Sequence, residues 1–161
     1  MSHHTLKDAL ARAIYTEIGA SNFYARMAAR IENPEGRRRF EQLSLDERGH
    51  RETLAKWYER MAGEPFVEEA DAVKASEIGD IAINDRVGAI EALDIAIDAE
   101  SKARAFYLEQ AHKAEEAGLR KMFEGLAEQE QGHYDLLTAE RNAVVGGFYW
   151  FDMDSAGFLE D

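Results

Sequence analysis

Apolar residues recur every three or four positions along most of the chain, which is the spacing of one face of an α-helix. The pattern predicts four long helices, at about residues 5–31, 34–61, 85–111 and 119–144. Asn33 and Pro34 form a helix-start signal before the second helix, and Gly63 follows its end. Gly118 marks the reversal between the last two helices. The predicted fold class is therefore all-α.

The longest connection between predicted helices, residues 63–84, shows no single strong period, although residues 68–78 can form a short helix. A connection of this length suits a crossover along a bundle better than a tight turn. We therefore predict a four-helix bundle with a long crossover between its second and third helices, which are then parallel neighbours or diagonal. Residues 1–161 are expected to form one domain, with the bundle at about 5–144 and a tail at 145–161.

Six ionisable residues lie on the apolar faces of these helices. They are Glu17, Glu47, His50, Glu100, Glu130 and His133. A further glutamate lies 30 residues before the glutamate of each Glu-x-x-His pair, in the preceding predicted helix. Buried carboxylates are costly unless they are paired, hydrogen-bonded or bound to a metal. No lysine lies on these faces, and Arg104 is the only basic candidate nearby. The pattern therefore predicts one buried site in which two divalent cations balance four carboxylates.

An internal repeat strengthens this interpretation. The second half matches the first without a gap at an offset of 83 residues. The matched pairs include Leu10/Leu93, Ala13/Ala96, Ile14/Ile97, Glu17/Glu100, Tyr24/Tyr107, Phe40/Phe123, Leu43/Leu126, Glu47/Glu130, His50/His133 and Leu54/Leu137. Two helix hairpins related by a pseudo-twofold axis would bring two equivalent half-sites face to face. Gly49 and Gly132, between each glutamate and histidine, suggest close backbone packing or space near the ligands.

Some of these features also have simpler explanations. A lone Glu-x-x-His on a helix is more often a surface or hydrogen-bonded pair than a ligand set, but two copies with upstream glutamates indicate a di-metal site. Tyr24 and Tyr107 follow their glutamates by seven residues. Such tyrosines are more often core residues than redox relays, and a role in supporting the ligands is the alternative. His112 has no counterpart in the repeat and is expected to be exposed.

Composition narrows the chemistry. A net charge of −13 argues against nucleic-acid binding, which needs a basic face, and the absence of cysteine leaves nitrogen and oxygen as metal ligands. No apolar run approaches the roughly 20 residues of a membrane span. The first residues also lack the features of a signal peptide. We therefore expect a cytoplasmic protein without membrane or nucleic-acid partners.

Over about residues 5–144 the paired Glu-x-x-His motifs resemble the ferritin-like superfamily, and specifically the rubrerythrin-type di-iron proteins. The resemblance implies a ferritin-like bundle in which Glu17, Glu47 and His50 form one half of the site. The corresponding residues of the repeat form the other half, and Glu47 and Glu130 bridge the metals. It also implies two iron ions that react with O2 or hydrogen peroxide. The same ligand set accepts manganese or zinc.

The sequence departs from that family in two respects. Typical rubrerythrins carry a further glutamate three residues after the ligand of the third helix, where this chain has Ala103. A rubredoxin domain is also absent, since the chain has no cysteine, so a peroxidase would need a separate electron-donor protein. The remaining four glutamates and two histidines are closer to the symmetric ferroxidase centre of bacterioferritin.

The leading functional prediction is a di-iron oxidoreductase of the ferroxidase or peroxidase type. The alternatives are an iron-binding protein for storage or delivery without turnover, and a metal-free helical interaction protein. The resemblance implies a homodimer or a larger homo-oligomer. The aromatic tail, residues 148–159, is expected to dock on its own bundle, or alternatively on a subunit or another protein.

Overall fold

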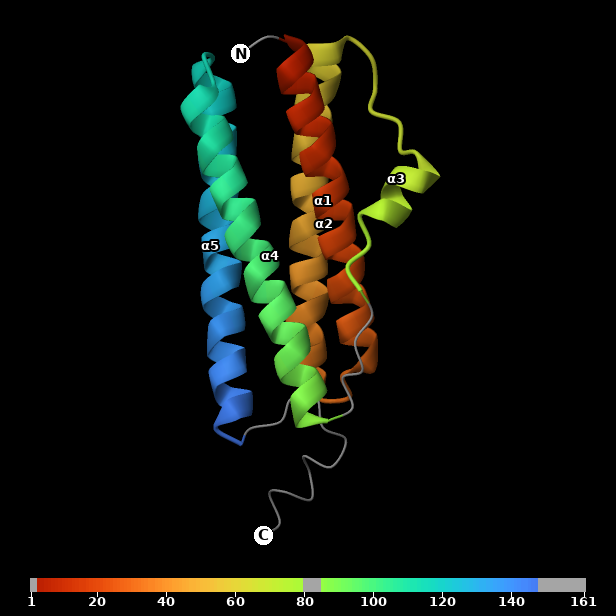
Figure 1. Cartoon of the computed structure of the whole chain (residues 1–161), viewed down its shortest axis with the longest axis vertical. Coiled ribbons are helices and arrows are strands. Elements are labelled where there is room, and N and C mark those ends of the chain that lie inside the picture. The colour runs from red at the N-terminus through yellow and green to blue at the C-terminus, as the bar shows by residue number, and fades with distance from the viewer. Residues whose placement is uncertain (1–2, 80–84, 148–161) are drawn as a thin grey trace.

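The computed structural model describes residues 3–79 and 85–147, and the elements in these two ranges are all helices (Figure 1). The five helices are α1 (His3–Arg30), α2 (Pro34–Ala62), α3 (Ala70–Ala75), α4 (Arg86–Lys113) and α5 (Ala117–Val145). The prediction of an all-α bundle is confirmed, and the aromatic tail lies outside the described residues. None of the described helices is long and apolar enough to span a membrane.

Side-chain caps fix several of the helix ends. The side chain of Asn33 accepts hydrogen bonds from the backbone amides of Glu35 and Gly36, so α2 begins where the sequence predicts. Asp85 caps α4 in the same way through the amide of Gly88. Gly63 ends α2 with a φ of 76°, a conformation that favours glycine.

The reversal between α4 and α5 was predicted at Gly118, and this placement is wrong. Gly118 lies in the first turn of α5, and the chain reverses at residues 114–116. Ala114 is buried there in an extended conformation, and the Arg120 guanidinium donates a 2.9 Å hydrogen bond to its carbonyl. Arg37 donates an equivalent 2.9 Å bond to the carbonyl of Ile31 in the first hairpin. Both hairpin turns are therefore held by the same repeated arginine contact.

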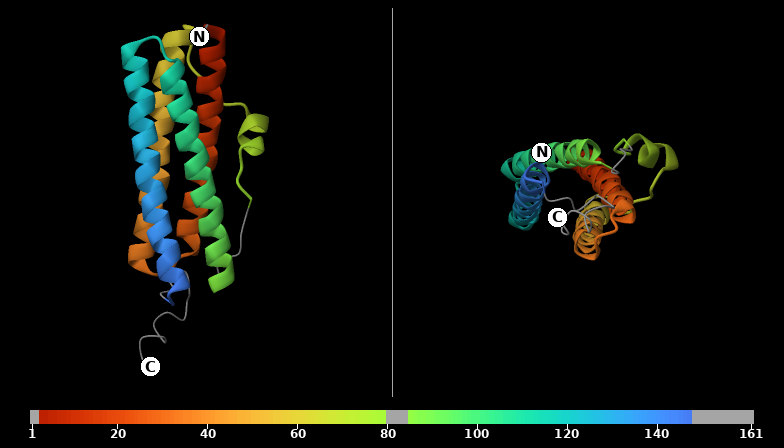
Figure 2. Two further views of the ribbon diagram at one scale, coloured as in Figure 1. Left: turned by 60° about the vertical axis from the view of Figure 1, so that its left-hand side comes forward. Right: turned by 90° about the horizontal axis from the view of Figure 1, so that it is seen from below.

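The four long helices form two hairpins that face each other. Helix α1 packs along α2 and α4 packs along α5, while α1 faces α4 and α2 faces α5 (Figure 2). The backbones of α2 and α4 do not approach each other within their described residues, so these two helices are diagonal and meet only through side chains at the centre of the bundle, which decides between the two arrangements left open by the sequence.

The core is divided into two apolar clusters by a polar layer at mid-height. We name them after their phenylalanines: the Phe40 cluster contains Tyr24, Leu43, Leu93 and Leu137, and the Phe123 cluster contains Leu10, Leu54, Tyr107 and Leu126. The offset of 83 residues exchanges the members of the two clusters. The repeat therefore corresponds to a pseudo-twofold axis that passes through the polar layer.

The crossover segment, residues 63–79, runs along the outside of α1 and includes α3 (Figure 1). It contacts α1 closely at Gly19, where a Cβ atom would lie 2.2 Å from the carbonyl oxygen of Ser76. Arg26 also donates a 2.6 Å hydrogen bond to the carbonyl of Ile78.

Gly49 and Gly132 are not sites of close backbone packing, which was one of the two arrangements suggested by the sequence. Both are exposed, and a Cβ atom at either would meet nothing within 4 Å.

These glycines predict opposite effects of alanine on the stability of the metal-free protein. Gly19→Ala should lower the free energy of unfolding by about 1–2 kcal/mol, because the added methyl group displaces the crossover segment. Gly49→Ala should raise it by up to about 1 kcal/mol, because alanine favours the helix and nothing obstructs it. Urea unfolding measures both, and equal stabilisation by the two substitutions would contradict the close contact at Gly19.

Candidate metal centre

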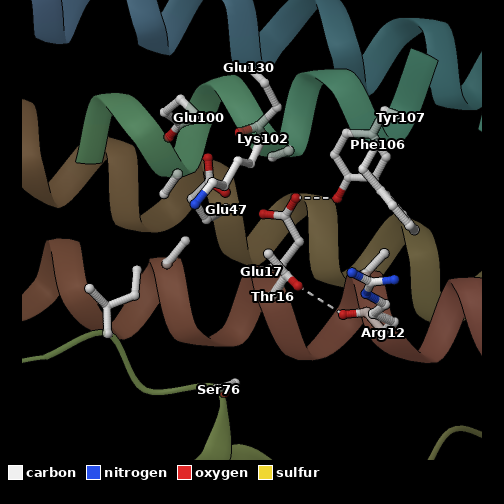
Figure 3. A pocket seen from close by; sticks show the side chains of 15 residues that line it. Arg12, Thr16, Glu17, Glu47, Ser76, Glu100, Lys102, Phe106, Tyr107 and Glu130 are labelled. Carbon is white, nitrogen blue, oxygen red and sulfur yellow. Dashed lines mark hydrogen bonds between the residues drawn. The ribbon is translucent and has the colours of Figure 1, made fainter. Parts of the chain in front are cut away.

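The polar layer contains the six ionisable residues that the sequence singled out. Each has a relative exposure of 8% or less. Glu17 comes from α1, Glu47 and His50 from α2, Glu100 from α4, and Glu130 and His133 from α5. Figure 3 shows the four glutamates converging from four different helices. One chain therefore supplies the whole cluster, which we call the six-residue cluster.

Each histidine of the cluster faces a glutamate of the other hairpin. The Nδ1 atom of His50 lies 2.7 Å from Oε1 of Glu130, and Nδ1 of His133 lies 2.7 Å from Oε1 of Glu47. The same nitrogens lie 3.5 Å from Glu17 and 3.4 Å from Glu100, respectively. The two hairpins thus interlock through their Glu-x-x-His motifs.

Two sets of four residues could each hold a cation, because their ligand atoms lie within 4.8 Å of one another. One set is Glu17, Glu47, His50 and Glu130, and the other is Glu47, Glu100, Glu130 and His133. Two glutamates, Glu47 and Glu130, belong to both sets. This overlap gives the geometry of two adjacent cation positions that share two carboxylates.

The donor atoms themselves provide a test of whether cations fit. Each residue of the cluster directs one buried polar atom inward, and these are Glu17 Oε2, Glu47 Oε1, His50 Nδ1, Glu100 Oε2, Glu130 Oε1 and His133 Nδ1. Four of them form the two 2.7 Å imidazole–carboxylate pairs, which are hydrogen bonds only when a proton lies between the two atoms, while Oε2 of Glu17 and Oε2 of Glu100 have no hydrogen-bond partner. Buried polar atoms are normally satisfied, so this concentration of carboxylates in one layer needs an explanation. Carboxylate oxygen and imidazole nitrogen suit iron, manganese and zinc. The residues present therefore fit a pair of divalent cations.

Two tyrosines hold the outer oxygens of the upstream glutamates. Tyr24 donates a 2.6 Å hydrogen bond to Oε1 of Glu100, and Tyr107 donates a short hydrogen bond to Oε1 of Glu17. Both tyrosines are 1% exposed and are core residues as well. Burial, followed by the charge of the adjacent glutamate, raises the pKa of each tyrosine well above its usual value. Both phenols therefore stay protonated and remain donors at neutral pH.

Without a cation, the cluster holds protons. Burial lowers the pKa of His50, but contacts with Glu130 and Glu17 outweigh burial and raise it to about 11. Burial and contact with Glu100 raise the pKa of Glu130 to about 10, and burial and the charge of Glu17 raise that of Glu47 well above its usual value. Protons on these groups reduce the repulsion among the four carboxyl groups.

The outer nitrogens of the two imidazoles are held by residues that the sequence interpretation missed. The Nε2 atom of His133 lies 3.1 Å from the carboxylate of Asp46, and Nε2 of His50 lies 2.6 Å from the amide oxygen of Gln129. Asp46 and Gln129 are equivalent under the 83-residue offset, and each directly precedes a glutamate of the cluster. An acceptor at Nε2 leaves Nδ1 directed inward as a ligand.

The basic residues near the cluster also differ from the prediction. Arg104 is exposed and lies off the inner face of α4, because the inner positions of this helix are Glu100, Ala103 and Tyr107. Arg12 and Lys102 are instead among the cations beside the cluster, because both line a cavity that reaches its glutamates. Neither residue lies on an apolar stripe, so periodicity gave no signal for them. His112 is exposed, as predicted.

Comparisons with known proteins identify the family and agree with the helical fold. The family model described as Rubrerythrin matches residues 8–141, which include all six cluster residues. Among solved structures, a hypothetical protein from Pyrococcus furiosus has 26% sequence identity and a TM-score of 0.69, with 88% of this chain and 90% of that chain covered. A search of curated proteins found no match.

The protons of the cluster predict a pH dependence for cation binding. His50 and Glu130 must lose protons to become ligands, so binding of zinc should release protons and become tighter as pH rises from 6 toward the pKa values of about 11 and 10. Each proton released changes the apparent affinity about tenfold per pH unit. Calorimetry in two buffers with different heats of ionisation measures the release. Equal heats in both buffers would contradict a protonated cluster.

The different acceptors at the two histidines predict different effects of substitution. Asp46→Asn replaces a carboxylate acceptor with an amide and should weaken binding of one of two cobalt ions by roughly tenfold or more, because His133 becomes a poorer ligand. Asp135→Asn is the matched control, since this exposed aspartate only accepts a 2.9 Å hydrogen bond from Gln131. Stepwise cobalt(II) titration followed by absorbance measures both sites. Unchanged affinity in Asp46→Asn would exclude the proposed support of His133.

Proposed function

The chain belongs to the rubrerythrin family, and from this premise we propose that it is a di-iron oxidoreductase that reacts with hydrogen peroxide or O2. The observation that carries the proposal is the set of six buried, inward-facing donor atoms, one from each residue of the six-residue cluster. Members of this family typically bind iron, and the donor set also accepts manganese or zinc. We propose two iron ions as the resident cofactor.

The proposed roles of the residues follow from their positions. Glu47 and Glu130 would bridge the two cations, because both belong to the two overlapping sets of potential ligands. His50 and His133 would each supply one Nδ1 ligand. Glu17 and Glu100 would bind terminally through Oε2, because a tyrosine holds the other oxygen of each. When bound, two ferrous ions would supply the two electrons that convert one hydrogen peroxide and two protons into two water molecules.

The surrounding residues orient the proposed ligands and limit the approach of other molecules to them. Tyr24 and Tyr107 fix the orientation of the terminal carboxylates, while Asp46 and Gln129 fix the imidazole rings. The cavity between α1 and α4 connects the glutamates with exposed residues, so a small oxidant can approach from that side. The two apolar clusters above and below the layer restrict water from the two ends of the bundle, whereas a second pocket lined by Arg48 and Arg51 also reaches Glu17.

Ala103 bears on the type of reaction. It lines the cavity beside Glu100, at the position where typical rubrerythrins carry a further glutamate. With alanine there, the proposed centre has six protein ligands, as in a symmetric ferroxidase centre. We therefore favour oxidation of ferrous iron as the basic reaction, with peroxidase turnover dependent on a separate electron-donor protein. Iron binding for storage or delivery is the alternative.

We also propose that the chain forms a single ferritin-like domain and assembles as a homodimer or larger homo-oligomer. The six-residue cluster is complete within one chain, so assembly is not needed to supply a ligand. A change in the oligomeric state of the protein should therefore leave the proposed site in place.

Removal of the two shared carboxylates tests the proposed function. Glu47→Ala combined with Glu130→Ala should reduce iron from two ions per chain to a small residual amount, because each cation position loses two ligands. Elemental analysis measures the iron. The matched control is Glu41→Ala with Glu124→Ala, a repeat-related pair of exposed glutamates on the same two helices. The same iron content in both double variants would exclude the site.

A redox assay then separates turnover from storage. Addition of one hydrogen peroxide to the anaerobic di-ferrous protein should oxidise two iron ions, as measured by absorbance and Mössbauer spectroscopy. Re-reduction of the oxidised protein by a small-molecule or protein donor, followed by a second oxidation, is the expected result. Iron that is oxidised once and then resists every donor would favour the storage alternative.

A further inference from the structure

A cavity of about 310 Å³ lies between α1 and α4, with the glutamates of the six-residue cluster at its inner end (Figure 3). We call it the α1–α4 cavity. A single water needs only on the order of 10–15 Å³ of such space, so access of O2 or hydrogen peroxide requires far less. A volume of this size lies at the lower end of the range for pockets that bind organic molecules.

Small side chains from both helices form one part of the cavity wall. They are Ala13, Thr16 and Ala20 on α1, and Ala99 and Ala103 on α4. Ala20 and Ala103 are equivalent under the 83-residue offset, as are Thr16 and Ala99. The cavity therefore straddles the pseudo-twofold axis, where both helices present small side chains to each other.

The outer end of the cavity carries positive charge beside an aromatic ring. The Arg12 guanidinium lies over the ring of Phe106, 5.5 Å from its centroid. Lys102 lies one turn before Phe106 on α4, and its side chain is 78% exposed. It pairs with Asp98 at 2.9 Å, and such exposed pairs are weak and easily exchanged for another partner.

We propose that the α1–α4 cavity binds a small organic acid, with its carboxylate at Arg12 and Lys102 and its apolar body along the alanine-lined wall. The two cations at the entrance match an anionic head group, and the alanines and Phe106 match an apolar chain or ring. The volume of about 310 Å³, at the lower end of the range for organic ligands, suits a fatty acid of medium length.

This inference rests on the proposed function in one respect. Two bound cations neutralise the four glutamates at the inner end, and without them these glutamates would repel an anion. The bound acid would lie with its apolar end toward the metals. The site is thus separate from the metal ligands but adjacent to them.

Octanoate is a suitable probe, and the full chain loaded with redox-inert zinc is the protein to use. Elemental analysis first establishes two zinc ions per chain, and calorimetry then measures octanoate binding. We expect one saturable site. Ala103→Leu should weaken binding about tenfold or more, because the larger side chain fills the cavity. The matched control is Ala105→Leu, which changes an exposed alanine on the same helix and should leave the affinity unchanged.

Variants without the positive charge test the contact with the carboxylate. They alter only exposed side chains, so they should leave the fold intact even if Ala103→Leu disturbs it. Arg12→Gln and Lys102→Gln should each weaken octanoate binding roughly two- to fivefold. Neither should change the affinity for 1-octanol, which has the same chain without the charge. Equal losses for octanoate and 1-octanol would overturn the assignment of the carboxylate to these cations.

The remaining outcomes separate the two proposals. Failure to bind zinc would overturn the metal site and the inference that rests on it. Two zinc ions without octanoate binding would overturn the organic-acid site alone. Octanoate binding that is equal in Ala103→Leu and Ala105→Leu would place the acid elsewhere and would also overturn it.

Discussion

The burial of four carboxyl groups and two imidazoles in one layer is the constraint on which the rest of the structure depends. Desolvation of so many ionisable groups is costly, and each must be compensated by protons, hydrogen bonds or cations. Tyr24, Tyr107, Asp46 and Gln129 satisfy the outward-facing atoms of the upstream glutamates and the histidines, while the six inward-facing atoms have only one another as neighbours. The two apolar clusters pack against this layer from either side, and apart from Tyr24 and Tyr107 their buried side chains offer no hydrogen bonds to its polar groups. The bundle is therefore organised around a buried layer of carboxylates and imidazoles that could hold cations.

Much of this arrangement could be predicted from the sequence, because helical periodicity and the internal repeat both single out the same residues. An ionisable residue at an apolar position is conspicuous, and the repetition of Glu47 and His50 at Glu130 and His133 made coincidence a poor explanation. Contacts that depend on how the hairpins face each other were not predictable in this way. Asp46 and Gln129 lie beside the apolar stripe, and only the approach of the opposite hairpin brings them to a histidine. The surroundings of the glycines were not predictable for a related reason, since a missing side chain gives no indication of what lies opposite. Gly19 contacts the crossover segment, whereas Gly49 faces open space.

The pseudo-twofold symmetry is broken at functionally important positions. Asp46 and Gln129 are equivalent, yet one offers a carboxylate and the other an amide to the imidazole it faces. A carboxylate acceptor makes an imidazole a stronger donor to its metal than a neutral amide does. We therefore expect the two proposed cation positions to differ in affinity, even though the residue types proposed to bind the cations are the same. Gly19 and Lys102 are also equivalent in the repeat, and one accommodates the crossover segment while the other places a charge at the mouth of the α1–α4 cavity.

The α1–α4 cavity follows from the same constraint. The cavity of about 310 Å³ opens toward the exposed side chains of Arg12 and Lys102, so water can fill it and it is not a dry void. The bundle cannot remove this volume by moving α1 closer to α4, because Glu17 and Glu100 are fixed by tyrosines of the opposite hairpin and by the dimensions of the cluster. Larger side chains at Ala20 and Ala103 would fill it but would also close the approach to the glutamates. The small residues therefore keep open a space that water or a ligand must occupy, and the charges at its outer end determine which ligands enter.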